Sequence, residues 1–161
     1  MIRDFRGELG RMQIDNAAGI LAGTDFFAIC TDEERRLLAF ASERKRYPAG
    51  TVITNPGDVP IGAQVLVTGA VSVTPDDGGH PRVVSQAGAV LDLMSLMVEK
   101  PRHVTVTAIS NVETLIVPRS AFLKLAANSP ELAKGAADRI RRDLLGFMAT
   151  VTNTGRKISK D

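Results

Sequence analysis

The sequence contains one cysteine and two histidines in 161 residues. A single cysteine excludes an intramolecular disulfide bond, and Cys30 ends the apolar run 26–30, which predicts a buried, unreactive thiol. A metal enzyme on a β-rich frame would need two or three histidines near a carboxylate, whereas His80 follows a turn-forming sequence at 76–79. No phosphate-binding loop or nucleophile elbow is present either. We therefore expect no metal site and no enzyme.

Aromatic residues are also scarce, because the chain has six phenylalanines, one tyrosine and no tryptophan. The core must therefore be built from Val, Leu, Ile, Ala and Met. Hydrophobic residues still make up 44% of the chain and charged residues 24%, values that are typical of a globular protein and exclude a mainly disordered chain. A length of 161 residues fits one domain.

Neither sign of charge dominates, and long hydrophobic runs are missing. Twenty Lys and Arg residues oppose eighteen Asp and Glu residues, and the net charge of +2 is too small for non-specific binding to nucleic acid. The longest uncharged segment, 59–75, is interrupted by proline and glycine, so it is no membrane span. The N-terminus lacks the apolar stretch of a signal peptide. We expect a cytoplasmic protein without a membrane-spanning segment.

A capping box marks the start of a helix. Thr31 precedes Glu34 by three residues, a spacing at which each side chain accepts a hydrogen bond from the backbone of the other residue. Residues 35–42 then carry apolar side chains at helical spacing, and the sequence Tyr-Pro-Ala-Gly at 47–50 ends the pattern. A shorter helical stretch is expected around residues 19–22.

Between residues 51 and 118 the sequence alternates β-branched runs with turns. The runs lie at residues 52–53, 65–67, 71–73, 83–84, 104–106 and 115–117. Short strands without intervening helices indicate a β-sandwich, barrel or β-roll rather than a parallel sheet. Gly57, Gly69 and Gly88 fall between predicted strands, where only glycine adopts a positive φ without penalty. Residues 91–97 contain no β-branched side chain and predict a short inserted helix.

Helical periodicity returns after Pro118. We expect one short helix over residues 120–127 and a longer one from Pro130, because proline is favoured in the first turn of a helix. The longer helix carries a heptad seam whose apolar residues alternate spacings of four and three: Ala133, Ala137, Ile140, Leu144, Phe147 and Val151. This seam either packs on the β-domain or pairs with a second copy of the chain, in a homodimer through residues 133–151.

These patterns divide the chain into three parts. Residues 1–18 form an N-terminal segment without a clear pattern, residues 19–152 form one domain that includes the C-terminal helix, and residues 153–161 form a tail. The basic residues of the tail are typical of a frayed end rather than of a binding arm.

The motifs occur in an order that is known from one family. Phe26-Phe27 precedes the capping box, an aromatic-Pro-x-Gly strand motif follows at 47–53, and Gly57-Asp58 precedes a Gly-x-Val-x-Val motif at 69–73. In order and spacing this resembles the cyclic nucleotide-binding domain of the catabolite-activator (Crp/Fnr) type, over about residues 21–148. The resemblance implies an α+β fold, in which an antiparallel β-roll (a jelly-roll-like double-stranded β-helix) is flanked by N-terminal helices and a long C-terminal helix. It also implies a regulatory role, with cyclic AMP and cyclic GMP as candidate ligands.

The ligand site of this family is a phosphate-binding cassette. Aligned without a gap, the cassette and the residues that follow it comprise Leu91, Asp92, Leu93, Met94, Arg102 and His103. By resemblance, Asp92 stands in place of a glycine and Leu93 in place of the glutamate that binds the ribose. Arg102 corresponds to the residue that pairs with the cyclic phosphate, and His103 replaces a serine or threonine. Arg102 therefore either contacts a phosphate or forms an internal salt bridge with Asp92.

The other side of the pocket departs from the family in the same direction. Polar residues that contact the purine in the activator branch correspond to an apolar stretch near Leu144, Phe147 and Met148, which would form the lid. We expect a pocket that is empty, filled by its own side chains or adapted to a less polar ligand. The sequence ends without a helix-turn-helix, so direct DNA binding is not expected.

Two functions are compatible with these observations. The first is a stand-alone regulatory or sensor module with an altered cassette, which dimerises through its last helix. The second is a ligand-independent dimeric interaction or scaffold domain of the same fold, which binds a protein partner.

Overall fold

The computed structural model describes the backbone of residues 5–159 and the side chains of residues 7–145. The N-terminal part contains α1 (Phe5–Ala22), the 3₁₀ turn η2 (Phe27–Ile29) and α2 (Asp32–Ala41). The strands are β1 (Glu43–Tyr47), β2 (Val52–Thr54), β3 (Gly62–Thr68), β4 (Val71–Pro75), β5 (Arg82–Val84), β6 (Val90–Leu91), β7 (Val104–Ala108) and β8 (Val112–Pro118). A second 3₁₀ turn, η3 (Leu93–Leu96), follows β6, and the chain ends with α3 (Arg119–Ala127) and α4 (Pro130–Ser159).

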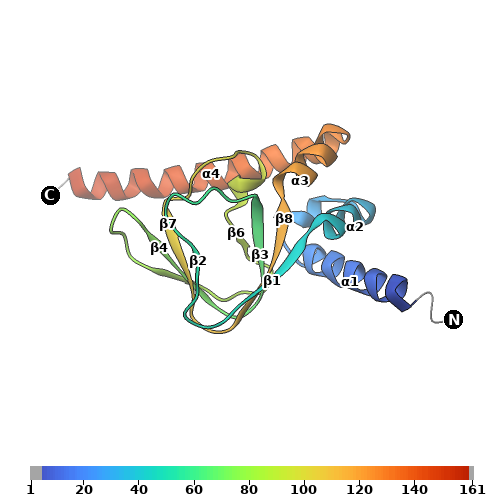
Figure 1. The fold of residues 1–161 in the computed structure, drawn as a ribbon. Coiled ribbons are helices and arrows are strands. Elements are labelled where there is room, and N and C mark those ends of the chain that lie inside the picture. Colours follow the sequence, from blue (N-terminus) through green and yellow to red (C-terminus); the bar gives the residue numbers. More distant parts are fainter. Residues whose placement is uncertain (1–4, 160–161) are drawn as a thin grey trace.

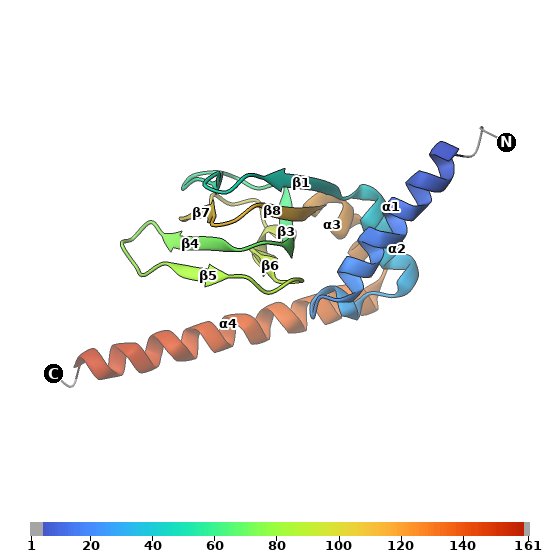
Figure 2. The ribbon, with the colours of Figure 1, turned by 90° about the horizontal axis from the view of Figure 1, so that it is seen from below.

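The eight strands form two antiparallel sheets that face each other. One sheet has the order β1-β8-β3-β6 and the other the order β2-β7-β4-β5. Figure 1 shows α1, α2 and α3 gathered at one end of this β-roll, while α4 extends along its side. The view from below shows α1 crossing close to α2 at that same end (Figure 2). The α+β roll with flanking helices that the sequence predicts is confirmed.

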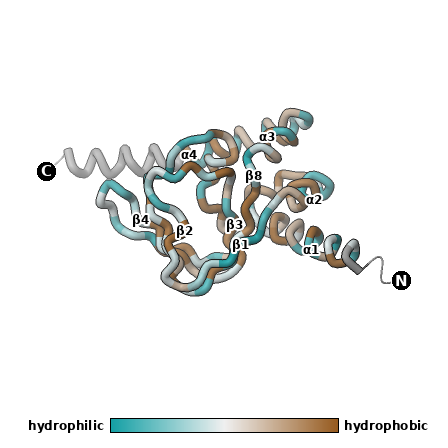
Figure 3. Tube along the Cα trace, in the orientation of Figure 1, coloured by the Kyte–Doolittle hydropathy of each residue, from teal (hydrophilic) through white to brown (hydrophobic). Residues whose placement is uncertain are grey.

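Two clusters of apolar side chains make up the core. The first joins the helices to the outer face of the β1-β8-β3-β6 sheet, and the second fills the space between the sheets. Because side chains alternate along a strand, β3 contributes Val65 to the first cluster and Leu66 to the second, and both are fully buried. Figure 3 shows β3 as hydrophobic and the tip of the β4–β5 hairpin as hydrophilic.

Phenylalanine packing connects the first cluster to the N-terminal helices. The rings of Phe26 and Phe27 lie 5.0 Å apart at an interplanar angle of 87°, and Phe122 of α3 contacts both. This edge-to-face arrangement is the favoured one for aromatic pairs. Cys30 lies in the same cluster, where burial raises the pKa of its thiol to about 12, so the thiol stays protonated at neutral pH.

The predicted local motifs are present. Thr31 and Glu34 form both hydrogen bonds of the capping box at the start of α2. Gly57, Gly69 and Gly88 have φ values of 93°, 92° and 89°. At Gly69 a Cβ atom would also lie 2.3 Å from the carbonyl oxygen of Asn111, so no other residue fits there.

Strand β1 is a correction to the sequence prediction, which placed only the end of a helix before Tyr47. Helix α2 ends at Ala41, and residues Glu43–Tyr47 pair with β8 instead. Four consecutive charged residues, Glu43 to Arg46, hide the strand from a search for apolar alternation. Charged side chains are typical of an edge strand, where they oppose pairing with other chains.

Both terminal helices are longer than expected. Helix α1 begins at Phe5, well before residues 19–22, and its half-buried Ile14 and buried Ala17 and Leu21 recur at helical spacing. Helix α4 continues to Ser159, into the segment that the sequence assigns to the tail.

The heptad seam of α4 largely faces away from the roll over its described part. Leu132 and Ala136 are the residues that α4 buries, whereas Ala133 and Ala137 are exposed. Ile140 packs against the first cluster, and Leu144 is 50% exposed. The side chains of Phe147, Met148 and Val151 lie outside the described residues. Within the described helices, no segment is long and apolar enough to cross a membrane.

We expect Phe27→Ala to lower the free energy of unfolding by about 3–5 kcal/mol, because the side chain is completely buried among other rings. The control is Phe40→Ala, since Phe40 is 76% exposed and should change stability by less than about 0.5 kcal/mol. Urea-induced unfolding followed by circular dichroism measures both values. Similar losses in the two variants would contradict the placement of the core.

Candidate functional site

The cassette segment contains a left-handed residue at its centre. Strand β6 leads into Asp92, which has φ 69° and ψ 69°, and η3 follows directly. Within residues 5–159, Asp92 is the only residue other than glycine with a positive φ. An aspartate tolerates this backbone conformation better than most residues, and a glycine adopts it freely. Position 92 therefore has the backbone of a glycine and the side chain of an acid.

The Asp92 carboxylate binds two groups. Arg102 Nη1 lies 3.0 Å from Asp92 Oδ2, and the hydroxyl of Ser95 donates a hydrogen bond to the same oxygen. The two charged side chains are mostly buried, with 19% of Arg102 and 15% of Asp92 exposed. The internal salt bridge, one of the two interpretations that the sequence allowed for Arg102, is present.

The backbone of Arg102 is fixed from the opposite side. Its N–H donates to the carbonyl of Asp58 at 2.8 Å, and the N–H of Gly57 donates to the carbonyl of Arg102, also at 2.8 Å. The turn at Asn55–Asp58 is itself closed by a hydrogen bond from the backbone of Asn55 to the Asp58 carboxylate. Arg102 is thus held by its backbone at this turn and by its guanidinium at Asp92, next to η3.

The remaining predicted residues do not converge on this ion pair. Leu91 is buried in the second cluster, while Leu93 packs against the first. Met94 is 41% exposed. His103 is exposed, and its Nδ1 lies 3.6 Å from Asp76 Oδ2 at the β4–β5 hairpin. Of the lid residues, Leu144 is half exposed, and Phe147 and Met148 lie outside the described side chains.

Two residues of the site were missed from the sequence. Ser95 donates a hydrogen bond to the Asp92 carboxylate. A serine three residues after an aspartate is a local signal that could have indicated this contact. Arg119, at the start of α3, donates to the carbonyls of Ser95 at 2.9 Å and Pro60 at 3.1 Å. No sequence pattern predicts these contacts, because they join segments that are 24 and 59 residues apart.

The cassette also borders α4. A hollow of about 240 Å³ is lined by Val90 and Leu93 from the cassette side and by Arg139 and Asp143 from α4. Arg139 lies 3.5 Å from Asp143 and 3.7 Å from Asp25, in the loop after α1. A displacement of η3 would therefore change the surroundings of Arg139 and Asp143 on α4. Among the described residues, no group of three or more His, Cys, Asp or Glu side chains could hold a metal ion.

We expect Asp92→Val to destabilise the fold by about 1–2 kcal/mol more than Asp92→Asn does, because valine is strained in the left-handed region and asparagine is not. Both substitutions remove the carboxylate, so the difference between them isolates the backbone. Urea unfolding of the two variants measures it. Equal losses would show that the backbone at position 92 is free to relax.

Comparisons with known proteins point to one family. The family model "Cyclic nucleotide-binding domain" matches residues 44–129, and no curated protein matches the chain. A cyclic nucleotide-binding-like protein from Brucella abortus is 30% identical, with a TM-score of 0.59 over 70% of this chain and 98% of its own. The catabolite activator protein of Thermus thermophilus is 25% identical, with a TM-score of 0.65 over 79% of this chain and 61% of its own.

The fold alone is also shared with the N-terminal domain of a transcriptional regulator from Streptomyces coelicolor, which is 21% identical with a TM-score of 0.67 over 82% of this chain and 94% of its own. The family match over residues 44–129 spans nearly all of both sheets, the predicted cassette and Arg102, and thus more than half of the chain. The resemblance drawn from the sequence motifs is therefore confirmed: the chain belongs to the cyclic nucleotide-binding domain family.

Proposed function

We propose that the chain is a regulatory module of this family in which its own Asp92 carboxylate occupies the phosphate position of the cassette. The Asp92–Arg102 ion pair carries this proposal. A cyclic phosphate could pair with Arg102 only after displacing Asp92, and the displaced carboxylate would then lie unpaired beside a second anion. Repulsion of this kind opposes binding strongly where the groups are shielded from water.

The ribose position supports the same conclusion. Leu93 has no polar atom to accept a hydrogen bond from a 2′-hydroxyl, and it packs against the first core cluster. A lost contact of this kind weakens binding by about 1–3 kcal/mol. We therefore propose weak, millimolar binding of cyclic AMP and cyclic GMP rather than the tight binding that an intact cassette would give.

Signal transmission in this proposal runs from η3 to α4. An anion that draws Arg102 away from Asp92 would release Ser95 and η3, and Leu93 would then move against Arg139 and Asp143. A change in how α4 packs would form the two-state element that regulation requires. The role is one of binding, as is typical of the family, and not of catalysis.

We expect a gain of binding when the cassette is restored. The variant Asp92→Gly with Leu93→Glu frees Arg102, suits the left-handed backbone and supplies a ribose carboxylate, so it should bind cyclic AMP at least about tenfold more tightly than the wild type. Isothermal titration calorimetry with cyclic AMP and cyclic GMP measures the affinities.

The control for this titration is Arg102→Ala in both backgrounds, which should abolish the remaining heat. Micromolar binding by the wild type would contradict a self-occupied cassette. So would a restored variant that binds no better than the wild type. No heat from the wild type at millimolar ligand, together with a gain in the restored variant, would favour a scaffold domain that works without ligand.

The ligand-independent dimeric scaffold is the second candidate, and the exposed seam of α4 favours it. Ala133, Ala137 and Leu144 lie on one face of the helix and are not covered by the roll. A role without ligand also agrees with the interior of the roll, because aliphatic side chains such as Leu66, Val73 and Val106 fill the space between the sheets. Pairing of two seams would bury apolar surface that the described chain leaves in contact with water.

We expect the wild type to sediment as a dimer at micromolar concentration and Ala137→Asp with Leu144→Asp to sediment as a monomer, because two charges would then lie on the exposed part of the seam. The control is Leu145→Asp, because Leu145 is 58% exposed but lies about 100° further round the helix than Leu144 and so outside the seam. A wild type that stays monomeric at high micromolar concentration would rule out the homodimer.

A further inference from the structure

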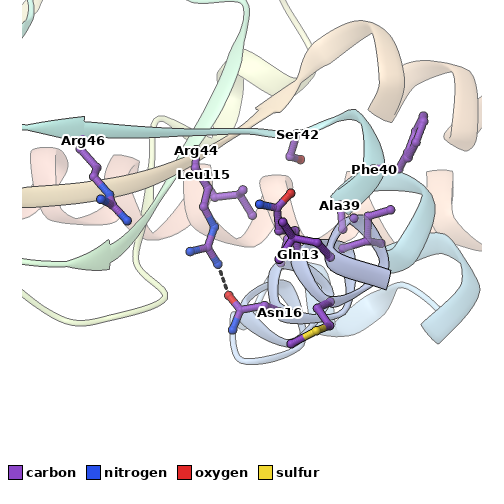
Figure 4. A pocket seen from close by; sticks show the side chains of 13 residues that line it. Gln13, Asn16, Ala39, Phe40, Ser42, Arg44, Arg46 and Leu115 are labelled. Atoms are coloured by element: carbon purple, nitrogen blue, oxygen red, sulfur yellow. Dashed lines mark hydrogen bonds between the residues drawn. The ribbon is translucent and has the colours of Figure 1, made fainter. Parts of the chain in front are cut away.

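A groove lies outside the cassette, between α1, the end of α2 and strand β1 (Figure 4). Its volume is about 640 Å³. The floor includes the buried side chain of Leu115, from β8. Arg44 and Arg46 of β1 lie along one side (Figure 4). The groove exists because β1 is the outermost strand of its sheet and α1 covers only part of that sheet's outer face.

Large apolar side chains at the rim of this groove are in contact with water. Leu9 is 46% exposed, Met12 is 66% exposed and Phe40 is 76% exposed, and all three line the groove. They come from two helices and form one patch around it. Exposed apolar patches of this kind, containing Met, Phe and Arg, are typical of protein interaction surfaces rather than of small-molecule pockets.

The charge of the groove is positive. Among the residues that the structure describes, its lining includes Arg44 and Arg46 and no carboxylate. Glu113 of β8 pairs with both arginines: its Oε1 lies 3.1 Å from Arg44 Nη1 and 3.8 Å from Arg46 Nε, so one carboxylate is shared by two guanidinium groups. Asp15 of α1 is engaged by Arg36. Two positive charges, on Arg44 and Arg46, thus face one negative charge, on Glu113, and these pairs leave one positive charge without a partner.

The two arginines differ in how firmly they are held. Arg44 also donates a hydrogen bond to Asn16 Oδ1 on α1, which fixes its guanidinium at the wall of the groove (Figure 4). Arg46 has an 85% exposed side chain and only the longer contact to Glu113. The positioned guanidinium of Arg44 and the exposed guanidinium of Arg46 can both pair with carboxylates of a bound chain.

We propose that this groove docks an acidic amphipathic segment of a partner protein. Apolar side chains of the segment cover Leu9, Met12 and Phe40, and its carboxylates pair with Arg44 and Arg46. The charge complementarity selects an acidic partner, and the extent of the exposed patch beyond the hollow selects a peptide segment over a small anion. The surface is separate from the cassette, so either proposal can fail without the other.

The test uses a phage-displayed library of random 16-residue peptides, selected on the wild-type protein. We expect the selected sequences to combine Asp and Glu with large apolar residues. A synthetic peptide with the sequence of the best clone is labelled with fluorescein. It should bind the variant Arg44→Glu with Arg46→Glu at least about tenfold more weakly than it binds the wild type. Met12→Ser with Phe40→Ser, which alters only exposed side chains, should weaken binding to a similar extent.

The matched control is Arg82→Glu, at an exposed position of β5 that does not line the groove and should bind like the wild type. Three results would overturn the proposal. The library yields no peptide that is sensitive to the groove variants, or the sensitive peptides are not acidic. Alternatively, Met12→Ser with Phe40→Ser converts a sedimenting dimer into a monomer, in which case the groove is covered by a second copy of the chain.

Discussion

The ion pair between Asp92 and Arg102 joins the residue that precedes η3 to the segment that precedes β7. The backbone of Arg102 is in turn hydrogen-bonded to the turn at Asn55–Asp58, so Arg102 connects three segments of the roll. A mostly buried guanidinium needs an anionic partner, because an unpaired charge there is strongly destabilising. In a ligand-binding cassette that anion can come from the ligand. Here the chain supplies it, and the left-handed backbone at Asp92 places the carboxylate where it is needed.

An anion that the chain itself supplies to Arg102 changes the function that we expect from the surrounding fold. The two sheets lie almost entirely within the segment that matches the cyclic nucleotide-binding domain model. In the function that we propose, the Asp92–Arg102 ion pair and Leu93 leave the two sheets intact and weaken binding of a cyclic nucleotide. The surfaces of the frame then gain importance. The exposed seam residues of α4 and the basic groove beside β1 lie on different elements. One chain could therefore pair with another copy through α4 and bind a partner protein in the groove.

The sequence predicts what depends on local chemistry. The capping box at Thr31, the glycine turns and the β-branched strands follow from residue types and spacing, and the salt bridge is one of the two contacts that the sequence allowed for Arg102. What it misses depends on distant neighbours. Strand β1 has four charged residues out of five and forms because β8 pairs with it, and Arg119 joins segments through contacts that no spacing encodes. The face of α4 that is buried is also decided by packing, since Leu132 and Ala136 are covered, whereas the seam residues Ala133, Ala137 and Leu144 are exposed.

A double-mutant cycle on the ion pair tests the central claim most directly. The free energy of unfolding is measured in urea for the wild type, Asp92→Asn, Arg102→Gln and the double variant. If the two side chains satisfy each other's charge in the cassette, the cycle should give a coupling energy of about 1–3 kcal/mol. A coupling energy within about 0.3 kcal/mol of zero would mean that Arg102 is not neutralised by Asp92 and stays available to an anionic ligand.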